Sequence, residues 1–511
     1  MGSEFGIFCL LPAAVGIVLA LITKQTVLSL VVAAWVGATM LSGYNPILGF
    51  LSLINDYMIP SIGGNGSMLF LVTASGGLIA MLRVTGAAQA FAQIVTKTVN
   101  SAKKGQIVTT LSAFIFCYTE PCLILGTIMR PVTDIVRVSR AKLAYILDSM
   151  GCNLASFSPI SSYGPFITGL IATELVAAGL SDNAWGIWAG MLKFNMYSLF
   201  AMITVLMVAI FGLDFGPMKK EEMRARKTGK LLADGVEPLV PEVKNIFPEG
   251  YQPTLMNFIV PFVCLFGGLF ATIFYTGNLA ENGFKDVFLN ANITLAISVG
   301  FITGGIGAGV VGVATKLFKP TKAFNHFVDG MAELINVPFI LVAAWGLGGV
   351  TKALNVGAFM AGMVGEHLDP GLVPAIIFLF GAIISFATGS SWGVWSIMMP
   401  IGFPMAVAFD IPLAYAVGAV ISGGMFGDQC SPVSDTTVMS STGASCNHIV
   451  HVMTQLPYGI MVGASAFVGF LFGGLTGQYV LSIGVTAVVL YTALFIATKV
   501  FKGKDTELEA A

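Results

Sequence analysis

The sequence predicts an all-α polytopic membrane protein with two inverted repeats, each containing a re-entrant hairpin and a broken transmembrane helix. Composition is the first indication. Of the 511 residues, 56% are hydrophobic and only 10% are charged, whereas soluble proteins carry about 25% charged residues. Apolar segments of about 20 residues, long enough to cross a bilayer, recur along the chain. A soluble globular protein is therefore excluded.

Repeated motifs about 270 residues apart predict an internal duplication. Ser-Pro-Ile-Ser-Ser at 158–162 matches Ser-Pro-Val-Ser-Asp at 431–435, and collinear matches join 128–131 to 397–400 and 71–74 to 341–344. The alternative is chance similarity among apolar segments. Apolar segments interrupted by Pro, Gly or Ser at corresponding positions of two halves are typical of the binding sites of secondary transporters.

The membrane-spanning segments are expected to make about 11 crossings. Segments 105–133 and 371–408 are too long for one helix and hold polar or helix-breaking residues at their centres, so each is expected to enter and leave the membrane on one side. The crossings are expected at 5–22, 26–42, 67–83, 141–178 (broken), 185–213, 255–276, 290–315, 336–352, 412–445 (broken), 455–475 and 477–498.

The placement of basic residues supports this topology. If the hairpins do not cross, each half has an odd number of crossings, and the second half is inverted. With the N-terminus outside and the C-terminus in the cytoplasm, all of the 25 Lys and Arg lie on the cytoplasmic side except Lys193, Lys285 and Lys352, as the positive-inside rule requires. The expected parts are a first repeat at 1–213, a cytoplasmic linker at 214–253, a second repeat at 254–475, and an extra C-terminal helix with a tail at 476–511.

Two kinds of polar segment connect these parts. The linker mixes Lys, Arg and Glu, and a solvated connector is expected rather than a regulatory or lipid-binding loop. Segments 84–100 and 321–335 are amphipathic and are expected to lie along the membrane interface. The seven cysteines show no metal-binding spacing and are expected to be small buried apolar residues.

The two breaks carry the expected chemistry. An unwound backbone at membrane depth survives only where it is buried in protein or lines a wet cavity, and there its carbonyls and hydroxyls can bind Na⁺. The alternative is that each Ser-Pro merely kinks a packed helix. The candidate Na⁺ ligands at the breaks and the hairpin tips are Ser158, Ser161, Ser431, Ser434, Asp435, Thr119 and Thr388.

Carboxylates at membrane depth are costly and indicate function. Asp435 lies in the second break, Asp428 just before it, and Glu120 at the first hairpin tip. A carboxylate that binds Na⁺ and H⁺ in turn would explain antiport. Asp435 could also cap the second half-helix. Asp148 is expected only to anchor a helix, and His448 and His451 to be solvated or to satisfy a helix end.

Several motifs resemble the NhaC family of Na⁺/H⁺ antiporters. The most specific is Gly-Asp-Gln-Cys-Ser-Pro-Val-Ser-Asp-Thr-Thr at 427–437, and the others lie at 130–134, 139–149, 158–162, 440–444 and 454–458. The resemblance covers nearly the whole chain. It implies two inverted repeats, an elevator-like motion, a homodimer, and a family that also includes malate/Na⁺-lactate antiporters and similar amino acid transporters.

The sequence departs from this family at the first hairpin tip. The family often has Asp-Asp-Tyr there, where this chain has Cys117, Tyr118 and Thr119, followed by Glu120. The departure leaves room for an organic substrate, such as an amino acid, between the two tips. Such a substrate would contact Glu120 on one side and the second tip on the other. The candidate substrate or proton residues are Glu120, Asp428, Ser162, Ser390, Ser391 and Trp392.

The expected function is Na⁺-coupled secondary active transport in the bacterial cell (inner) membrane. The open alternatives are Na⁺/H⁺ antiport and Na⁺-coupled transport of an amino acid or small carboxylate. An ion channel is the rival class, but no filter motif is present. An enzyme is not expected, because the sequence holds no nucleophile–base set or cofactor loop. Na⁺ is the expected coupling ion, with no organic cofactor and no nucleic acid partner.

Overall fold

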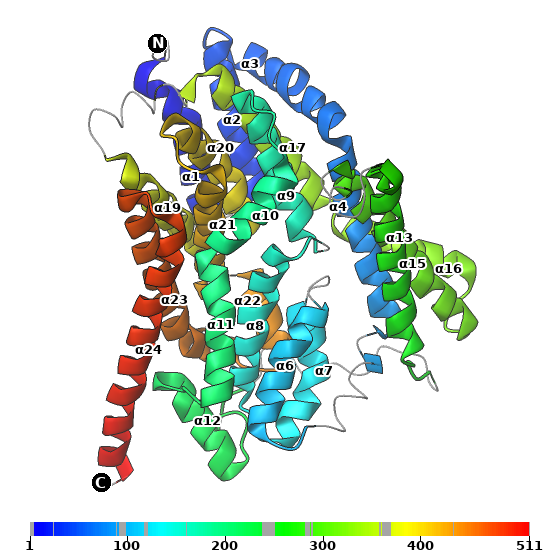
Figure 1. The fold of residues 1–511 in the computed structure, drawn as a ribbon, viewed down its shortest axis with the longest axis vertical. Coiled ribbons are helices and arrows are strands. Elements are labelled where there is room, and N and C mark those ends of the chain that lie inside the picture. Colours follow the sequence, from blue (N-terminus) through cyan, green and yellow to red (C-terminus); the bar gives the residue numbers. More distant parts are fainter. Residues whose placement is uncertain are drawn as a thin grey trace.

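The protein is described by a computed structural model in which every described element is a helix (Figure 1). The N- and C-termini lie at opposite ends of its long axis. The structure describes residues 5–23, 25–87, 89–90, 99–116, 121–159, 161–237, 251–281, 287, 290–356, 359, 369–432 and 434–509.

The first half contains a hairpin and a broken helix. The hairpin is formed by α6 (Ala102–Phe116) and α7 (Pro121–Ile135), and the broken helix by α8 (Arg140–Phe157) and α9 (Tyr163–Ala178). The other helices of this half are α1 (Leu11–Thr23), α2 (Thr26–Leu41), α3 (Pro46–Ser52), a π-helical turn (Leu53–Met58), α4 (Ile59–Thr85), α10 (Ala184–Met191) and α11 (Met196–Phe211).

The second half repeats this order. Its hairpin is formed by α19 (Val373–Thr388) and α20 (Ser391–Ala408), and its broken helix by α21 (Leu413–Cys430) and α22 (Asp435–Gly443). The other helices are α13 (Met256–Thr276), α15 (Ile293–Ala314), α16 (Pro320–Glu333), α17 (Asn336–Ala353), α23 (His448–Thr476) and α24 (Tyr479–Glu509).

The two breaks have the same backbone hydrogen bonds. In each motif, the N–H of the first serine donates to the carbonyl three residues earlier, at 3.2 Å in the first break and 3.0 Å in the second. The N–H of the next serine, three residues on, donates to the first serine at 3.4 Å in both. The proline between them has no N–H to donate, so the helix cannot continue. Both breaks lie near mid-height in Figure 1, between α8 and α9 and between α21 and α22.

Each hairpin packs against half-helices from both repeats. The first hairpin contacts α8 through a hydrogen bond from Cys122 Sγ to the Leu147 carbonyl (3.6 Å). It also contacts α22, because a Cβ added at Gly126 would lie 2.6 Å from the carbonyl carbon of Gly443. The second hairpin contacts α21 by the bond from Ser385 Oγ to the Gly424 carbonyl (2.6 Å), and its α20 contacts α9. The hairpins and broken helices therefore form one interlocked unit, which we call the core unit.

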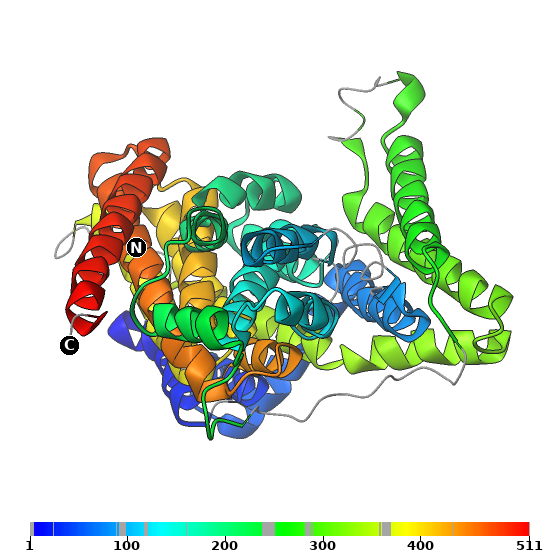
Figure 2. The same cartoon turned by 90° about the horizontal axis from the view of Figure 1, so that it is seen from below.

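Helices α4, α13, α15 and α16 form a group at one edge of the molecule, far from α23 and α24 (Figure 2). Small residues allow these helices to approach closely, which is a common way of packing helices in membranes. A Cβ added at Gly76 of α4 would lie 2.3 Å from the carbonyl oxygen of Gly330 in α16. The amphipathic segment expected at 321–335 is α16, whereas most of the segment at 84–100 lies outside the described residues.

The possible membrane spans differ in membership from the 11 expected crossings. By length and apolar composition, nine helical stretches within the described residues could cross a membrane, or ten if the pair Val27–Leu41 and Pro46–Gly63, bent by 113°, is one span. The hairpin helices α19 and α20 belong to this set, whereas the halves of the broken helices do not. The chain is thus an all-α polytopic membrane protein.

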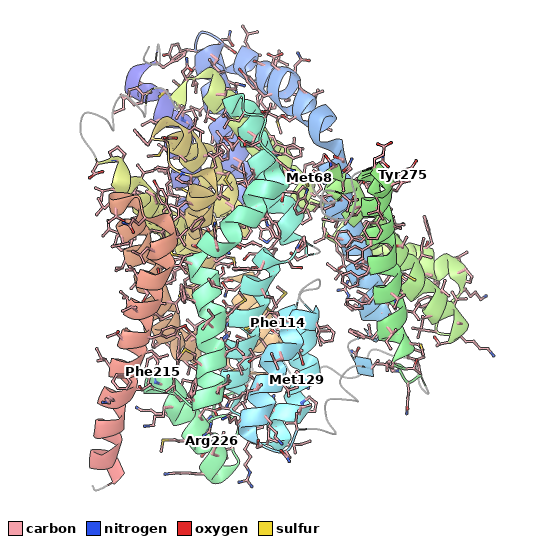
Figure 3. The ribbon with its side chains drawn as sticks, viewed as in Figure 1. Met68, Phe114, Met129, Phe215, Arg226 and Tyr275 are labelled. Atoms are coloured by element: carbon pink, nitrogen blue, oxygen red, sulfur yellow. The ribbon has the colours of Figure 1, made fainter. Side chains whose placement is uncertain are left out.

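The first part of the expected connector is a docked helix. In α12 (Gly216–Thr228), Met218, Glu222 and Ala225 are buried. The Glu222 carboxylate accepts hydrogen bonds from the Ser139 N–H (2.8 Å) and from Gln106 Nε2 (3.1 Å). The expectation of a wholly solvated connector is therefore wrong for α12, because its apolar face and one carboxylate pack on α6 and α8. Figure 3 shows Arg226 of this helix at the same end of the molecule as the C-terminus.

Candidate functional site

The second break holds a buried cluster of oxygen atoms. Asp428, in the last turn of α21, is 1% exposed, and its Oδ1 accepts a hydrogen bond from Ser434 Oγ at 2.6 Å. Ser434 Oγ lies 2.9 Å from Thr436 Oγ1. The buried Ser391 hydroxyl, at the start of α20, lies beside Asp428 and has no other hydrogen-bond partner among the described residues. Oxygen atoms from three segments therefore converge around one carboxylate.

Asp435 lies next to this cluster but is arranged differently. It occupies the first turn of α22, and its side chain is exposed. Its Oδ1 accepts a hydrogen bond from the Thr436 N–H at 2.9 Å. A carboxylate at a helix N-terminus is stabilised by the helix dipole. The capping residue of α22 is instead Ser434, whose Oγ accepts from the Thr437 N–H at 3.4 Å. Asp435 is the first residue inside the helix, so the expected capping role is wrong, and its carboxylate adds negative charge close to Asp428.

A second buried carboxylate links the two repeats. Asp148 of α8 is 0% exposed, and its Oδ2 accepts hydrogen bonds from Thr437 Oγ1 (3.1 Å) and Gln455 Nε2 (2.7 Å). Its Oδ1 accepts a weak bond from Cys152 Sγ (3.5 Å). Asp148 does more than the expected anchoring of one helix, because its partners lie on α22 and α23. Cys122, Asp148 and Cys152 offer ligand atoms within 4.8 Å of one another, a cluster that sequence spacing did not indicate.

A buried amide extends this polar centre. Gln429 Oε1 accepts hydrogen bonds from Asn153 Nδ2 (2.8 Å) and the Tyr197 hydroxyl (3.0 Å). Gln429 Nε2 donates to Ser149 Oγ at 2.6 Å. These bonds connect α21 to α8 and α11. Buried polar networks of this kind fix a unique arrangement when their members are satisfied.

A chain of hydrogen bonds runs from Asp148 through α22 and α23. Gln455 Nε2 donates to both Asp148 and the Gln429 carbonyl, so Gln455 Oε1, assigned from these partners, accepts from His451 Nε2 at 3.0 Å. His451 Nδ1 lies 2.9 Å from Ser441 Oγ, and His448 Nδ1 lies 3.1 Å from the same oxygen. His451 is fully buried, so the expectation that it is solvated is wrong.

This chain has two acceptors more than its hydrogens can serve. His448 Nε2 lies 2.7 Å from the Pro432 carbonyl, which can only accept. When His448 donates there, both histidine Nδ1 atoms face the single hydroxyl hydrogen of Ser441, and the Thr437 carbonyl accepts from the same hydroxyl at 2.8 Å. One hydroxyl supplies one hydrogen. The chain therefore has a place for one added proton.

At the first break, the predicted residue Ser161 bonds only to the backbone, and the predicted residue Ser162 lies at a helix end. Ser161 Oγ donates to the carbonyls of Ala155 (2.6 Å) and Ser158 (2.9 Å), and it accepts from the N–H groups that begin α9. Ser162 is the half-buried N-cap residue of α9. Ala155 stands where the second break has Asp428, so the first break has no carboxylate at that place.

The second hairpin tip lies at both breaks. Ser431 Oγ donates to the Phe386 carbonyl at 2.7 Å, two residues before Thr388. The Thr388 hydroxyl bonds to its own helix at Ile384 (2.9 Å), and Ser390 caps α20. Trp392 packs against two aromatic rings at the start of α9, with centroids 4.9 Å from Tyr163 and 4.4 Å from Phe166. The first tip, with Thr119 and Glu120, lies outside the described residues.

The fold and this central polar site define a class of protein, a polytopic membrane transporter with paired hairpins and broken helices. The Na⁺/H⁺ antiporter family matches residues 154–475, so the chain belongs to that family. This confirms the family resemblance expected from the sequence.

Individual proteins are similar to this chain in sequence, and one solved structure is similar in fold. An uncharacterised protein of Haemophilus influenzae is 30% identical over 96% of both chains. The malate-2H⁺/Na⁺-lactate antiporter of Bacillus subtilis is 30% identical over 37% of this chain and 40% of its own. The crystal structure of the YdaH transporter of Alcanivorax borkumensis has a similar fold, with a TM-score of 0.51, 13% identity, and coverage of 84% of this chain and 90% of that one.

Proposed function

We propose that the protein is a Na⁺-coupled secondary active transporter that exchanges Na⁺ for H⁺ across the bacterial cell membrane. The observation that carries the proposal is the buried Asp428 carboxylate in the second break, surrounded by the hydroxyls of Ser434, Thr436 and Ser391. An ionised carboxylate at membrane depth is expensive unless it binds a cation or a proton. The candidate site therefore alternates between these two occupants.

Na⁺ is a hard cation that takes oxygen ligands, and Asp428 is the strongest oxygen ligand at this break. The Ser391 hydroxyl, which lies beside Asp428 and accepts no hydrogen bond from any described residue, has lone pairs free to complete the shell. Exposed Asp435 then serves as a charge at the entrance. Na⁺ and H⁺ compete for the same carboxylate, so binding of one releases the other. This competition couples the two flows without a separate gate.

Protons reach the polar centre through the histidine chain. His448 lies at the start of α23, half-buried, and His451 lies buried behind it, 3.9 Å from Asp148 Oδ2. The place for one added proton between them lets a proton pass from His448 through Ser441 to His451. Asp148 stabilises the positive charge when His451 carries that proton. With the N-terminus outside, this chain opens toward the cytoplasm.

The motion and the oligomeric state are proposed from the family resemblance, and the interlocked core unit supports the motion. The unit moves as one body against its flanking helices in an elevator-like motion, and two copies of the chain form a homodimer in the membrane. Coupled transport of an organic solute is the second candidate function. It is favoured by similarity to the malate-2H⁺/Na⁺-lactate antiporter and by a cavity described below.

The test uses purified protein in liposomes that contain a pH-sensitive dye. An inward Na⁺ gradient should drive proton efflux in the wild type, and Asp428→Asn should abolish it while the protein elutes as a folded species. Asp182→Asn, an exposed acidic residue remote from the breaks, is the matched control. Na⁺-driven proton flux that survives in Asp428→Asn would overturn the proposed function.

A further inference from the structure

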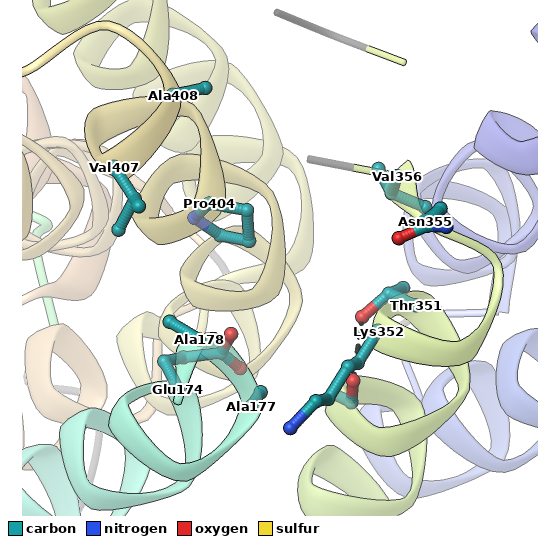
Figure 4. Close-up of a pocket in the computed structure, with 11 residues that line it drawn as sticks. Glu174, Ala177, Ala178, Thr351, Lys352, Asn355, Val356, Pro404, Val407 and Ala408 are labelled. Carbon is teal, nitrogen blue, oxygen red and sulfur yellow. Dashed lines mark hydrogen bonds between the residues drawn. The ribbon is translucent and has the colours of Figure 1, made fainter. Parts of the chain in front are cut away.

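A cavity of about 290 Å³ lies between the core unit and α17 (Figure 4). Its walls come from the C-terminal parts of α9, α17 and α20, in the half of the molecule that holds the N-terminus. Ligand cavities usually range from about 300 to 1,000 Å³, so this one suits a small molecule. Apart from Glu174, Thr351, Lys352 and Asn355, its lining is apolar or glycine.

Glu174 of α9 is the unusual group in this cavity. Its side chain is only 3% exposed and lines the cavity, yet no hydrogen bond or ion pair joins it to any described residue. A buried carboxyl group without a partner is expensive. Gly348 leaves room for it, because a Cβ there would lie 3.0 Å from Glu174 Oε1. A ligand that brings a cationic hydrogen-bond donor would satisfy this group.

Lys352 of α17 supplies the opposite charge at the same cavity. Its Nζ donates to the Val176 carbonyl at 2.9 Å, near the C-terminus of α9. An ammonium group has three hydrogens, so two remain for a ligand. Glu174 and Lys352 do not form an ion pair with each other, although Figure 4 shows both side chains reaching into the same space.

We propose that this cavity binds a small zwitterion, with its ammonium group at Glu174 and its carboxylate at Lys352. Each end of an amino acid then meets its opposite charge, and the separation between Glu174 and Lys352 is bridged by the ligand. The methyl groups of Ala177, Ala178 and Ala408 line the rest of the cavity and suit a small apolar side chain. The site goes beyond the Na⁺ and H⁺ binding proposed above and is separate from the second break.

The position of the cavity makes this site part of a transport path. Glu174 belongs to the core unit, whereas Lys352 belongs to a helix outside it. A motion of the core unit against α17 would separate the two charges and release the ligand. A zwitterion bound here would therefore be held in one state of the transporter and freed in the other.

Thermal unfolding of the purified full-length protein tests the proposal, with L-alanine, methylamine, acetate and NaCl as separate probes. L-Alanine should raise the melting temperature of the wild type more than methylamine or acetate at equal concentration. Glu174→Gln, which is isosteric, and Lys352→Gln, which changes an exposed side chain, should each require at least tenfold more L-alanine for the same shift. Asp182→Asn should respond like the wild type.

Three outcomes would overturn this site. The first is an L-alanine response in Glu174→Gln equal to that of the wild type. The second is a methylamine response as large as that of L-alanine together with no effect of Lys352→Gln, which would indicate a site for amines alone. The third is a NaCl response that Glu174→Gln removes, which would indicate a metal cation. A Na⁺ response lost in Asp428→Asn while L-alanine still binds leaves this proposal intact and concerns only the second break.

Discussion

Replacement of Ser434 by alanine should weaken Na⁺ binding strongly. Ser434 Oγ donates to Asp428 Oδ1 at 2.6 Å and lies 2.9 Å from Thr436 Oγ1. The substitution removes one proposed ligand and the hydrogen bond that orients the carboxylate. A hydrogen bond to a charged group contributes about 1.5–3 kcal/mol. At about 1.4 kcal/mol per factor of ten, Na⁺ affinity should fall by about 10- to 150-fold.

The internal repeat offers a matched control for this change. Ser161 has the same place in the first break, and its Oγ bonds only to backbone groups, donating to two carbonyls and accepting from the N–H groups that begin α9. Ser434 Oγ likewise accepts from the Thr437 N–H in the first turn of α22. Each substitution therefore removes a side-chain acceptor at a helix start, which costs about 1 kcal/mol of stability. Ser161→Ala should therefore lower the melting temperature as much as Ser434→Ala does, but leave Na⁺ affinity within about twofold, since no ligand hydrogen bond is lost.

The assay is Na⁺-dependent stabilisation of purified protein, followed as melting temperature against Na⁺ concentration. The double variant Ser434→Ala/Asp428→Asn completes a cycle, and the two effects should be strongly non-additive because the side chains are in contact. Equal Na⁺ affinities for Ser434→Ala and Ser161→Ala would refute the reasoning. Additive effects in the cycle would show that the two residues act separately.

Three further changes test other parts of the structure. His451→Phe should slow proton transfer while Na⁺ binding persists, which stopped-flow dye measurements can follow; unchanged rates would exclude the histidine chain as a route. Asp214→Ala should destabilise the protein by about 3–5 kcal/mol, because the buried Lys142 of α8 loses its partner. Asp234→Ala, in an exposed ion pair with Lys230, should leave the melting temperature almost unchanged; similar losses of melting temperature in the two variants would contradict this. Gly427→Ala should separate the second hairpin from α21, since its Cβ would lie 2.3 Å from a carbonyl oxygen of α19, and transport that stays at the wild-type level would show that this contact is dispensable.

The local features of the fold could be predicted from the sequence. Proline removes a backbone donor whatever surrounds it, so the two Ser-Pro motifs indicated where α8 and α21 end. Glycine in Thr388-Gly389-Ser390 has a positive φ of 68° and ends α19 at the expected hairpin tip. Asp428 could be proposed as a site residue because a carboxylate beside a membrane break is unusual in itself.

The long-range contacts could not be predicted. Asp148 was expected only to anchor a helix, because its partners Thr437 and Gln455 lie in the other repeat and no local pattern joins them. His451 was expected at a solvated helix end, since its burial depends on packing of α22 and α23. Glu174 was missed, although a carboxylate within an apolar segment is itself a sign of function, because a single glutamate does not reveal a cavity. For the histidine chain, the available clue was the spacing of His451 and Gln455, which places both side chains on one face of α23.

The interlocked arrangement of the core unit has a consequence for biosynthesis. Asp148 meets Thr437 and Gln455 across 289 and 307 residues of sequence. At about 5–20 residues per second, a ribosome needs roughly 15–60 s to make the intervening chain. During that time the first hairpin and α8 are in the membrane without α22 and α23, and the Asp148 carboxyl group lacks its hydrogen-bond partners. The native core therefore forms only after residues 437–455 have been inserted.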